Sequence, residues 1–289
     1  MMGLLDQLRA RAQGLARDTL KATWERTLDI GRDIADLGHS AVYLRQLLRG
    51  NRGAREHIES PDPGAATRGP PVLVIHGYFA TRGSLHLLER HLAQRGHVVM
   101  SYPLGPVNLG DIRTSAGLIG RKVESVIAQT GVPRVDIVGH SMGGLVGLYY
   151  LKRLGGRHRV RRLVLLGTPA RGTWSALLGL FTAPIGLASL QLLPGSQFLR
   201  DLADTPIPDG IEVTSIGAER DWLAPVDSTV LAGVRHLSVP TGHSGLLVEE
   251  DVADVVARIL QAPDQAPDQA PDQGPDQGPD SDGADGERR

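Results

Sequence analysis

The chain has 289 residues, of which 41% are hydrophobic, and this is enough for one large α/β domain with appendages. Residues 261–289 hold eight acidic residues and two arginines, a charge of −6, so the rest carries +5 of the formal total of −1. That mild excess gives no indication of nucleic-acid binding. The lack of cysteine excludes disulfides, a thiol nucleophile and a thiolate metal site.

Residues 1–60 place leucines and other apolar residues at approximately helical spacing among arginines and acids. The pattern predicts an arm of one or two amphipathic helices, followed by a Pro- and Gly-rich linker at 61–71. We expect the arm to dock on the main domain, because membrane-surface helices usually carry a more lopsided positive charge; contact with a membrane surface or lipid interface stays as the alternative. Charged residues in the first ten positions argue against an export signal, so we expect a cytoplasmic location, with peripheral membrane contact as the alternative.

From residue 72 to 260, apolar strands alternate with helices, which predicts a mainly parallel sheet covered by helices on both faces. In this architecture, catalytic groups gather beyond the carboxyl ends of the strands. The expected strands are 72–75, 98–101, 135–138, 163–166, 213–216 and 236–239, and the expected helices are 84–94, 111–129, 145–154 and 249–260.

Two further segments stand apart from this alternation. Residues 172–207 lie between two strands and are strongly apolar, which indicates either a lid whose underside faces an acyl chain or an ordinary crossover helix. Residues 261–289 repeat Ala/Gly-Pro-Asp-Gln, and proline at every fourth position predicts a disordered, solvated tail.

The pentapeptide Gly139-His140-Ser141-Met142-Gly143 lies between an expected strand and an expected helix. This context is typical of a tight turn that exposes a serine nucleophile, and the glycines are needed because neighbouring backbone approaches closely. Serine is a poor nucleophile at neutral pH, so Ser141 requires a histidine as base and an acid to orient that histidine.

The base and the acid are expected on loops after later strands. His243 follows the last strand and precedes the final helix, and Asp221 follows the strand at 213–216. Glu219 and Asp227 are rivals for the acid, but either would need the loop to turn differently, and we expect Asp221 because of its place near the strand end, where a fold of this kind carries its acid. The backbone N–H groups of Met142 and Tyr78 are the expected donors to an oxyanion.

Taken together, these motifs resemble those of bacterial α/β-hydrolase lipases and esterases. The resemblance covers about residues 70–260 and includes His76-Gly77, Gly-His-Ser-Met-Gly at 139–143, Leu-Gly-Thr-Pro at 166–169, Pro-Gly-Ser at 194–196 and Gly-His-Ser-Gly-Leu-Leu at 242–247. It implies Ser141 as nucleophile, Asp221 as acid, His243 as base, and the Tyr78 and Met142 amides as the oxyanion hole.

The resemblance implies a serine carboxylic ester hydrolase that acts on small-molecule or lipid esters, with no metal or organic cofactor. An acyltransferase or thioesterase would use the same groups, and a noncatalytic lipid-binding or scaffold protein is the alternative from another class. The residues expected to line the acyl pocket are Phe79, Trp174, Leu177, Leu178, Phe181 and Leu246.

Overall fold

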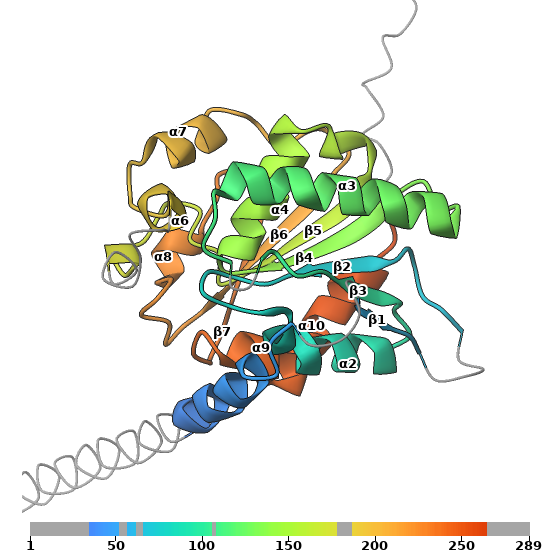
Figure 1. Ribbon diagram of the computed structural model, residues 1–289, viewed down its shortest axis with the longest axis horizontal. Helices are drawn as coiled ribbons and strands as arrows, with labels where there is room; N and C mark the ends of the chain where they lie inside the picture. The colour runs from blue at the N-terminus through green and yellow to red at the C-terminus, as the bar shows by residue number, and fades with distance from the viewer. Residues whose placement is uncertain (1–34, 52–56, 62–65, 106–107, 178–186, 265–289) are drawn as a thin grey trace, which may run out of the picture.

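The computed structural model describes residues 35–51, 57–61, 66–105, 108–177 and 187–264 (Figure 1). A seven-stranded sheet forms its centre, in the order β1-β3-β2-β4-β5-β6-β7. The strands are β1 (His57–Glu59), β2 (Val72–Ile75), β3 (Val99–Ser101), β4 (Val135–His140), β5 (Val160–Leu166), β6 (Glu212–Ala218) and β7 (Arg235–Val239). All neighbours pair in parallel except β1 and β3, which are antiparallel.

Helices cover both faces of the sheet, as the alternation in the sequence predicts (Figure 1). The helices are α2 (His86–Gln94), α3 (Ile112–Thr130), α4 (Met142–Arg153), α6 (Leu187–Gln191), α7 (Gln197–Ala203), α8 (Val226–Thr229), α9 (Gly245–Val248) and α10 (Glu250–Gln261), with short 3₁₀ turns η1 (Arg82–Leu85) and η2 (Gly156–His158). The six strands expected after residue 72 are all present. The expected helices are present as well, with the usual small differences at their ends.

Alternating side chains of each strand feed two separate hydrophobic cores. On β2, Leu73 and Ile75 join the core under α3 and α4, while Val72 and Val74 join the core over α2 and α10. Successive residues of a strand point to opposite faces, so a strand that is apolar at every position serves both cores at once. All four β2 residues are buried, which fits its place near the middle of the sheet.

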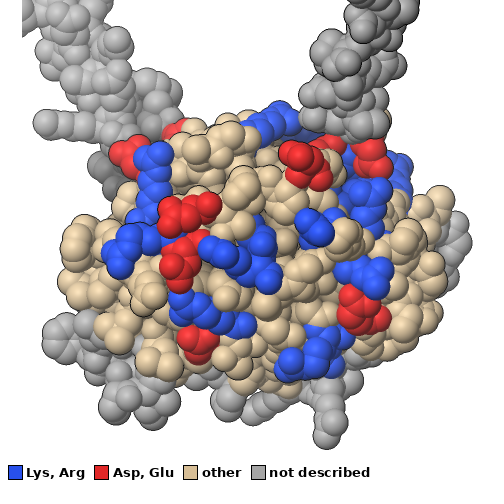
Figure 2. Space-filling view, turned by 90° about the horizontal axis from the view of Figure 1, so that it is seen from above, with Lys and Arg blue, Asp and Glu red and all other residues tan. Residues whose placement is uncertain are grey.

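Caps define where the longest helix begins and ends. Asp111 accepts a hydrogen bond from the Thr114 amide at 2.9 Å and closes the first turn of α3. Gly131 ends the helix in the left-handed conformation, with a φ of 72°. On the face that carries α3, basic and acidic side chains are interspersed (Figure 2), and ion pairs such as Arg113–Asp201 at 3.1 Å join α3 to its neighbours.

Charged side chains meet at the amino ends of β4, β5 and β6. The fully buried Asp136 accepts hydrogen bonds from Arg161 Nε at 3.0 Å and Nη2 at 2.6 Å. Arg162, only 1% exposed, donates from Nε to Glu212 at 2.6 Å. Both guanidinium groups also donate to the Leu260 carbonyl near the end of α10. We call these four charged residues the amino-end cluster; each buried charge in it has a partner of opposite sign.

Within residues 1–60, the structure describes one helix at 35–47 and the strand β1. This helix, called here the N-terminal helix, docks on the domain beside α9, as expected for the arm (Figure 1). β1 is a correction to the prediction, because residues 57–59 belong to the sheet and not to the arm. The prediction for 261–289 lies almost wholly outside the described residues. Among the helices that are described, none combines the length and the apolar character needed to cross a bilayer.

Candidate active site

Ser141 lies on the sharp turn between β4 and α4. Its backbone has a φ of 54° and a ψ of −127°, and its amide donates to the Leu166 carbonyl at 2.8 Å. Among the described residues, only Ser141 and Phe79 combine a side chain with a positive φ. Such conformations cost about 1–3 kcal/mol each and gather at functional sites. Both strained residues line one pocket, so backbone strain indicates that the functional site lies at this edge of the sheet.

Close backbone packing explains the glycines on either side of Ser141. A Cβ on Gly139 would lie 2.4 Å from the Gly144 Cα, and one on Gly143 would lie 2.3 Å from the Ile75 carbonyl oxygen. Both distances are far below van der Waals contact, and the atoms in the way belong to the backbone, which cannot rotate aside. The turn therefore requires glycine at both positions.

His243 and Asp221 are joined by a hydrogen bond. Nδ1 of His243 lies 2.5 Å from Oδ2 of Asp221, and Oδ1 of the same carboxylate accepts from the amides of Leu223 and Ala224 at 2.9 and 2.8 Å. A protonated Nδ1 in this bond leaves Nε2 as the proton acceptor of the ring. Glu219 and Asp227 are exposed and are not the partner of His243.

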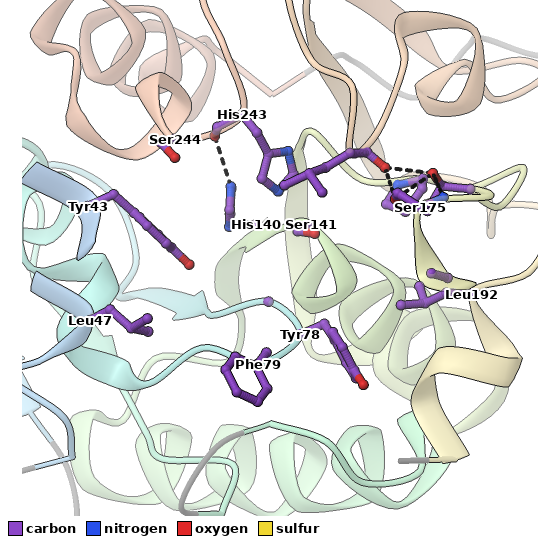
Figure 3. A pocket seen from close by; sticks show the side chains of 15 residues that line it. Tyr43, Leu47, Tyr78, Phe79, His140, Ser141, Ser175, Leu192, His243 and Ser244 are labelled. Atoms are coloured by element: carbon purple, nitrogen blue, oxygen red, sulfur yellow. Dashed lines mark hydrogen bonds between the residues drawn. The ribbon is translucent and has the colours of Figure 1, made fainter. Parts of the chain in front are cut away.

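Ser141 and His243 face the same pocket, as the close view shows (Figure 3). Ser141 comes from the end of β4 and His243 from the loop between β7 and α9, so the parallel strands bring together residues that are far apart in the sequence. Asp221, after β6, holds the far side of the imidazole. The structure thus gathers the three residues that the sequence singled out for this chemistry.

Two buried histidines support the turns around this site. His140 Nε2 lies 3.3 Å from the His243 carbonyl oxygen, and His76 Nδ1 lies 3.3 Å from the Gly77 carbonyl oxygen. Burial lowers the pKa of His76 to about 4, and burial also lowers the pKa of His140 well below its ordinary value. Both rings are therefore neutral at pH 7 and serve as hydrogen-bonding braces.

The loop after β2 brings Gly77, the residue before Tyr78, close to Ser141. A Cβ on Gly77 would lie 2.9 Å from Ser141 Cβ, so only glycine allows the loop to approach this closely. Asn108, which is fully buried, fixes the loop: its side-chain amide donates to the His76 carbonyl at 3.2 Å, and its backbone carbonyl accepts from the Phe79 amide at 3.2 Å. Nothing in the sequence pattern pointed to Asn108.

The pocket has a volume of about 350 Å³, within the usual range for small-molecule sites. It is lined by Tyr43, Leu47, Gly77, Tyr78, Phe79, His140, Ser141, Pro169, Thr173, Ser175, Ala176, Leu192, Leu223, His243 and Ser244. Apolar atoms make up most of its walls. Tyr43 and Leu47 come from the N-terminal helix, and sequence reasoning missed both.

Of the residues expected to line the pocket, some lie on its wall and others lie elsewhere. Phe79 lines the pocket, whereas Trp174 and Leu177 are exposed and lie outside its lining. Leu246 is wrongly placed by the sequence prediction, because it is fully buried in the core over α10 and not on a pocket wall. Leu178 and Phe181 lie outside the described residues. The 172–207 segment contributes instead Thr173, Ser175 and Ala176 near its start and Leu192 near its middle.

No three acidic or histidine side chains among the described residues lie close enough together to hold a metal ion. The groups at the pocket are a hydroxyl, an imidazole, a carboxylate and backbone amides. This donor set supports proton transfer and nucleophilic attack by Ser141.

The order of the strands, the turn at Ser141 and the loop positions are those of the α/β-hydrolase fold. The family model for the alpha/beta hydrolase fold matches residues 70–191, and the chain has this fold.

Solved structures with similar architecture include lipases. The mature form of Bacillus licheniformis lipase BlEst2 is 15% identical with a TM-score of 0.62, over 72% of this chain and 98% of that one. Aspergillus fumigatus lipase B is 18% identical with a TM-score of 0.59, over 73% of this chain and 57% of that one. The Paleococcus ferrophilus monoacylglycerol lipase is 14% identical with a TM-score of 0.51, over 71% and 97%. At these identities the likeness is one of fold.

Proposed function

We propose that the chain is a serine carboxylic ester hydrolase that works through an acyl-enzyme on Ser141. One observation carries the proposal: the strained Ser141 and His243 line a single pocket, and Asp221 is bonded to the other side of the His243 ring. A nucleophile, a base and a group that orients the base are the three parts that acyl transfer by serine requires.

In the first half of the proposed reaction, Ser141 Oγ attacks the ester carbonyl carbon while its proton passes to His243 Nε2. The Asp221 carboxylate stabilises the imidazolium that forms and keeps the ring in the required tautomer. Negative charge grows on the carbonyl oxygen, where the amides of Met142 and Tyr78 are proposed to donate hydrogen bonds. The Met142 amide also lies at the first turn of α4, whose dipole favours an anion.

The tetrahedral intermediate then breaks its bond to the alcohol oxygen, which takes the proton from His243. In the second half, His243 removes a proton from water, and the hydroxide oxygen attacks the acyl carbon. The bond to Ser141 Oγ breaks, the serine regains its proton from His243, and the carboxylic acid leaves. Water is the only reactant besides the ester, and Ser141 and His243 return to their starting protonation states.

The pocket walls favour an apolar acyl group. Phe79, Leu47 and Leu192 offer apolar surface, and transfer of each buried methylene from water contributes about 0.8 kcal/mol. The volume of about 350 Å³ accommodates an ester of short or medium chain length. The similar solved structures named as lipases agree with an ester substrate.

The test is a comparison of the wild-type chain, Ser141→Ala and Ser125→Ala with p-nitrophenyl esters of increasing acyl length. Ser125 lies on α3 outside the pocket and serves as the matched control. We expect Ser125→Ala to retain full activity and Ser141→Ala to lose activity by a factor of about 10⁴ or more. Equal activity in Ser141→Ala and the wild type would rule out the mechanism.

A further inference from the structure

We propose that the N-terminal helix positions the catalytic groups, with Asp36 as the positioning residue. Asp36 holds together the loop that carries Asp221, called here the acid loop, and the loop that carries His243, called here the base loop. The inference depends on the proposed function, because it assigns to this helix the alignment of Asp221 with His243. The helix at 35–47 lies outside both the family match at 70–191 and the sequence resemblance.

Asp36 contacts both loops at once. Arg220 donates to it from Nε at 2.5 Å and from Nη2 at 2.9 Å, and the Gly242 amide donates to Oδ1 at 3.1 Å. Arg220 is the residue directly before Asp221, and Gly242 is the residue directly before His243. One carboxylate therefore fixes the chain immediately upstream of the proposed acid and of the proposed base.

Arg220 extends the same bridge to a third point on the base loop. Its Nη1 donates to the Pro240 carbonyl at 2.6 Å, and its backbone amide donates to the Thr241 carbonyl at 3.0 Å. The Arg220 guanidinium holds the pKa of Asp36 below its ordinary value, so the carboxylate is ionised at neutral pH. A bidentate pair of ionised groups fixes both distance and orientation, which a single neutral hydrogen bond does not.

The second turn of the helix adds another contact on the base loop. His39 Nδ1 lies 3.2 Å from Oε1 of Glu249, and the Thr241 hydroxyl donates to the same oxygen. Thr241 is fully buried two residues before His243.

The carboxyl end of the helix holds the loop that carries Tyr78. The Leu47 carbonyl accepts from the Thr81 hydroxyl at 3.0 Å, and the Gly50 carbonyl accepts from the Gly83 amide at 3.1 Å. Asn51 accepts from the Arg82 amide at 3.0 Å. The helix and the turn that follows it therefore touch all three loops that bear proposed catalytic groups other than Ser141.

Between these two ends, the helix supplies part of the pocket wall. Tyr43 and Leu47 line the pocket, and the close view shows both side chains directed toward it (Figure 3). The Tyr43 ring is 6.5 Å from the His140 ring, which in turn is 4.6 Å from the His243 ring. Substrate bound at Ser141 would therefore meet this helix.

The residues by which the N-terminal helix contacts the domain indicate that it positions the loops and does not merely cover apolar surface. The residues that face the domain include Asp36, His39 and Gln46, whereas Leu37 and Leu44 remain 71% and 54% exposed. Hydrogen bonds of this kind add little net free energy each, but they set geometry. Displacement of a catalytic group by about 1 Å costs up to about 100-fold in rate.

The test compares Asp36→Asn with the matched control Asp254→Asn in the full chain. Asp254 also receives a hydrogen bond from an arginine at 2.5 Å, from Arg95, but this pair joins α10 to the end of α2 and lies outside the pocket lining. We expect Asp36→Asn to lower kcat on p-nitrophenyl butyrate by about 10- to 100-fold with KM changed less than about threefold. Asp254→Asn should match the wild type, and Asp36→Glu should regain most of the lost kcat.

Hydrogen exchange of the same variants provides a readout that is independent of activity. In Asp36→Asn, amides at 217–224 and 239–246 should exchange faster than in the wild type, while those of β2 and β4 should not change. If exchange and kcat in Asp36→Asn equal those of Asp254→Asn, the positioning role is wrong. If the wild type hydrolyses no ester, the proposed function fails, and the exchange data alone then decide whether Asp36 holds the two loops.

Discussion

The two ends of the sheet bury polar groups in opposite ways. At the amino ends of the strands, the buried charges Asp136 and Arg162 are each paired with an opposite charge. At the carboxyl ends, the buried His76 and His140 are neutral, and the backbone of Ser141 is strained. Paired charges hold strands and helices in place at one end, whereas at the other end neutral histidines brace the turns around a strained serine, and strained residues of this kind gather at functional sites. The two ends of one sheet thus differ: buried ion pairs at the amino ends serve the fold, and the strained Ser141 at the carboxyl ends lies at the pocket.

The largest expected effect is on chemistry at the carboxyl end. Asp221→Asn should lower kcat on p-nitrophenyl esters by about 10⁴-fold, because an amide at this position favours the wrong tautomer of His243. Asp227→Asn, at the exposed rival on α8 six positions after Asp221, is the control and should keep full activity. Similar kcat values for the two variants would show that Asp221 does not orient the base.

The next effect is on stability at the amino end. Asp136→Asn removes the buried anionic partner of Arg161 and leaves it only the exposed Asp264 at 3.3 Å, so the free energy of unfolding should fall by about 3 kcal/mol in urea denaturation. Because this cluster is at the opposite end of the sheet, kcat of the folded variant should not change.

The control for this loss is Asp201→Asn, which breaks the partly exposed pair with Arg113 and should cost less than about 1 kcal/mol. A loss of stability no larger than that of the control would mean that the amino-end cluster contributes little to the fold.

A third effect is the pH dependence of the free energy of unfolding, which arises from the buried histidines at the carboxyl end. The pKa of His76 is about 4 in the folded chain against an ordinary 6.5, so the unfolded chain binds the proton first as the pH falls. Stability is therefore complete above about pH 6.5 and decreases toward pH 4, by roughly 3 kcal/mol from His76 alone. His140 acts in the same direction.

Urea midpoints measured from pH 7.5 to 4 test this dependence. His76→Gln should flatten the curve, whereas His158→Gln, at an exposed position on η2, should leave its slope unchanged. An unaltered slope in His76→Gln would exclude this histidine as the source of the acid sensitivity.

The smallest effect concerns backbone strain at the nucleophile. Ser141→Gly should be more stable than Ser141→Ala by about 1 kcal/mol, because glycine accepts a φ of 54° while its greater freedom in the unfolded chain offsets part of the gain. Thermal and urea unfolding of the two inactive variants measure the difference. Equal stabilities would mean that the turn stores no strain.

The sequence predicted the sheet well because most of its strands contain short, largely apolar runs bounded by turns. It missed β1, since the strand consists of His57, Ile58 and Glu59 and pairs at the edge of the sheet, where polar residues are tolerated. Ser141, Asp221 and His243 were singled out because they follow β4, β6 and β7, and the carboxyl ends of parallel strands share one edge of the sheet.

Other parts of the site could not be predicted because they depend on long-range contacts. Asn108 fixes the Tyr78 loop from a segment with no distinctive pattern. Tyr43 and Leu47 belong to a recognisable amphipathic helix, yet periodicity shows which face of a helix is buried and not which surface it meets. Leu246 was misplaced for a related reason, since its α9 turn directs it into the core.

The bridge made by Asp36 also limits when the site can form during synthesis. Its partners Arg220 and Gly242 lie 184 and 206 residues further along the chain. At ribosomal speeds this distance takes on the order of 10 to 40 seconds to translate. The N-terminal helix leaves the ribosome before these loops and can bind them only after they have been synthesised. A nascent chain that already holds Ser141 has therefore not yet aligned its base. Hydrolysis would then begin only after nearly the whole domain has left the ribosome.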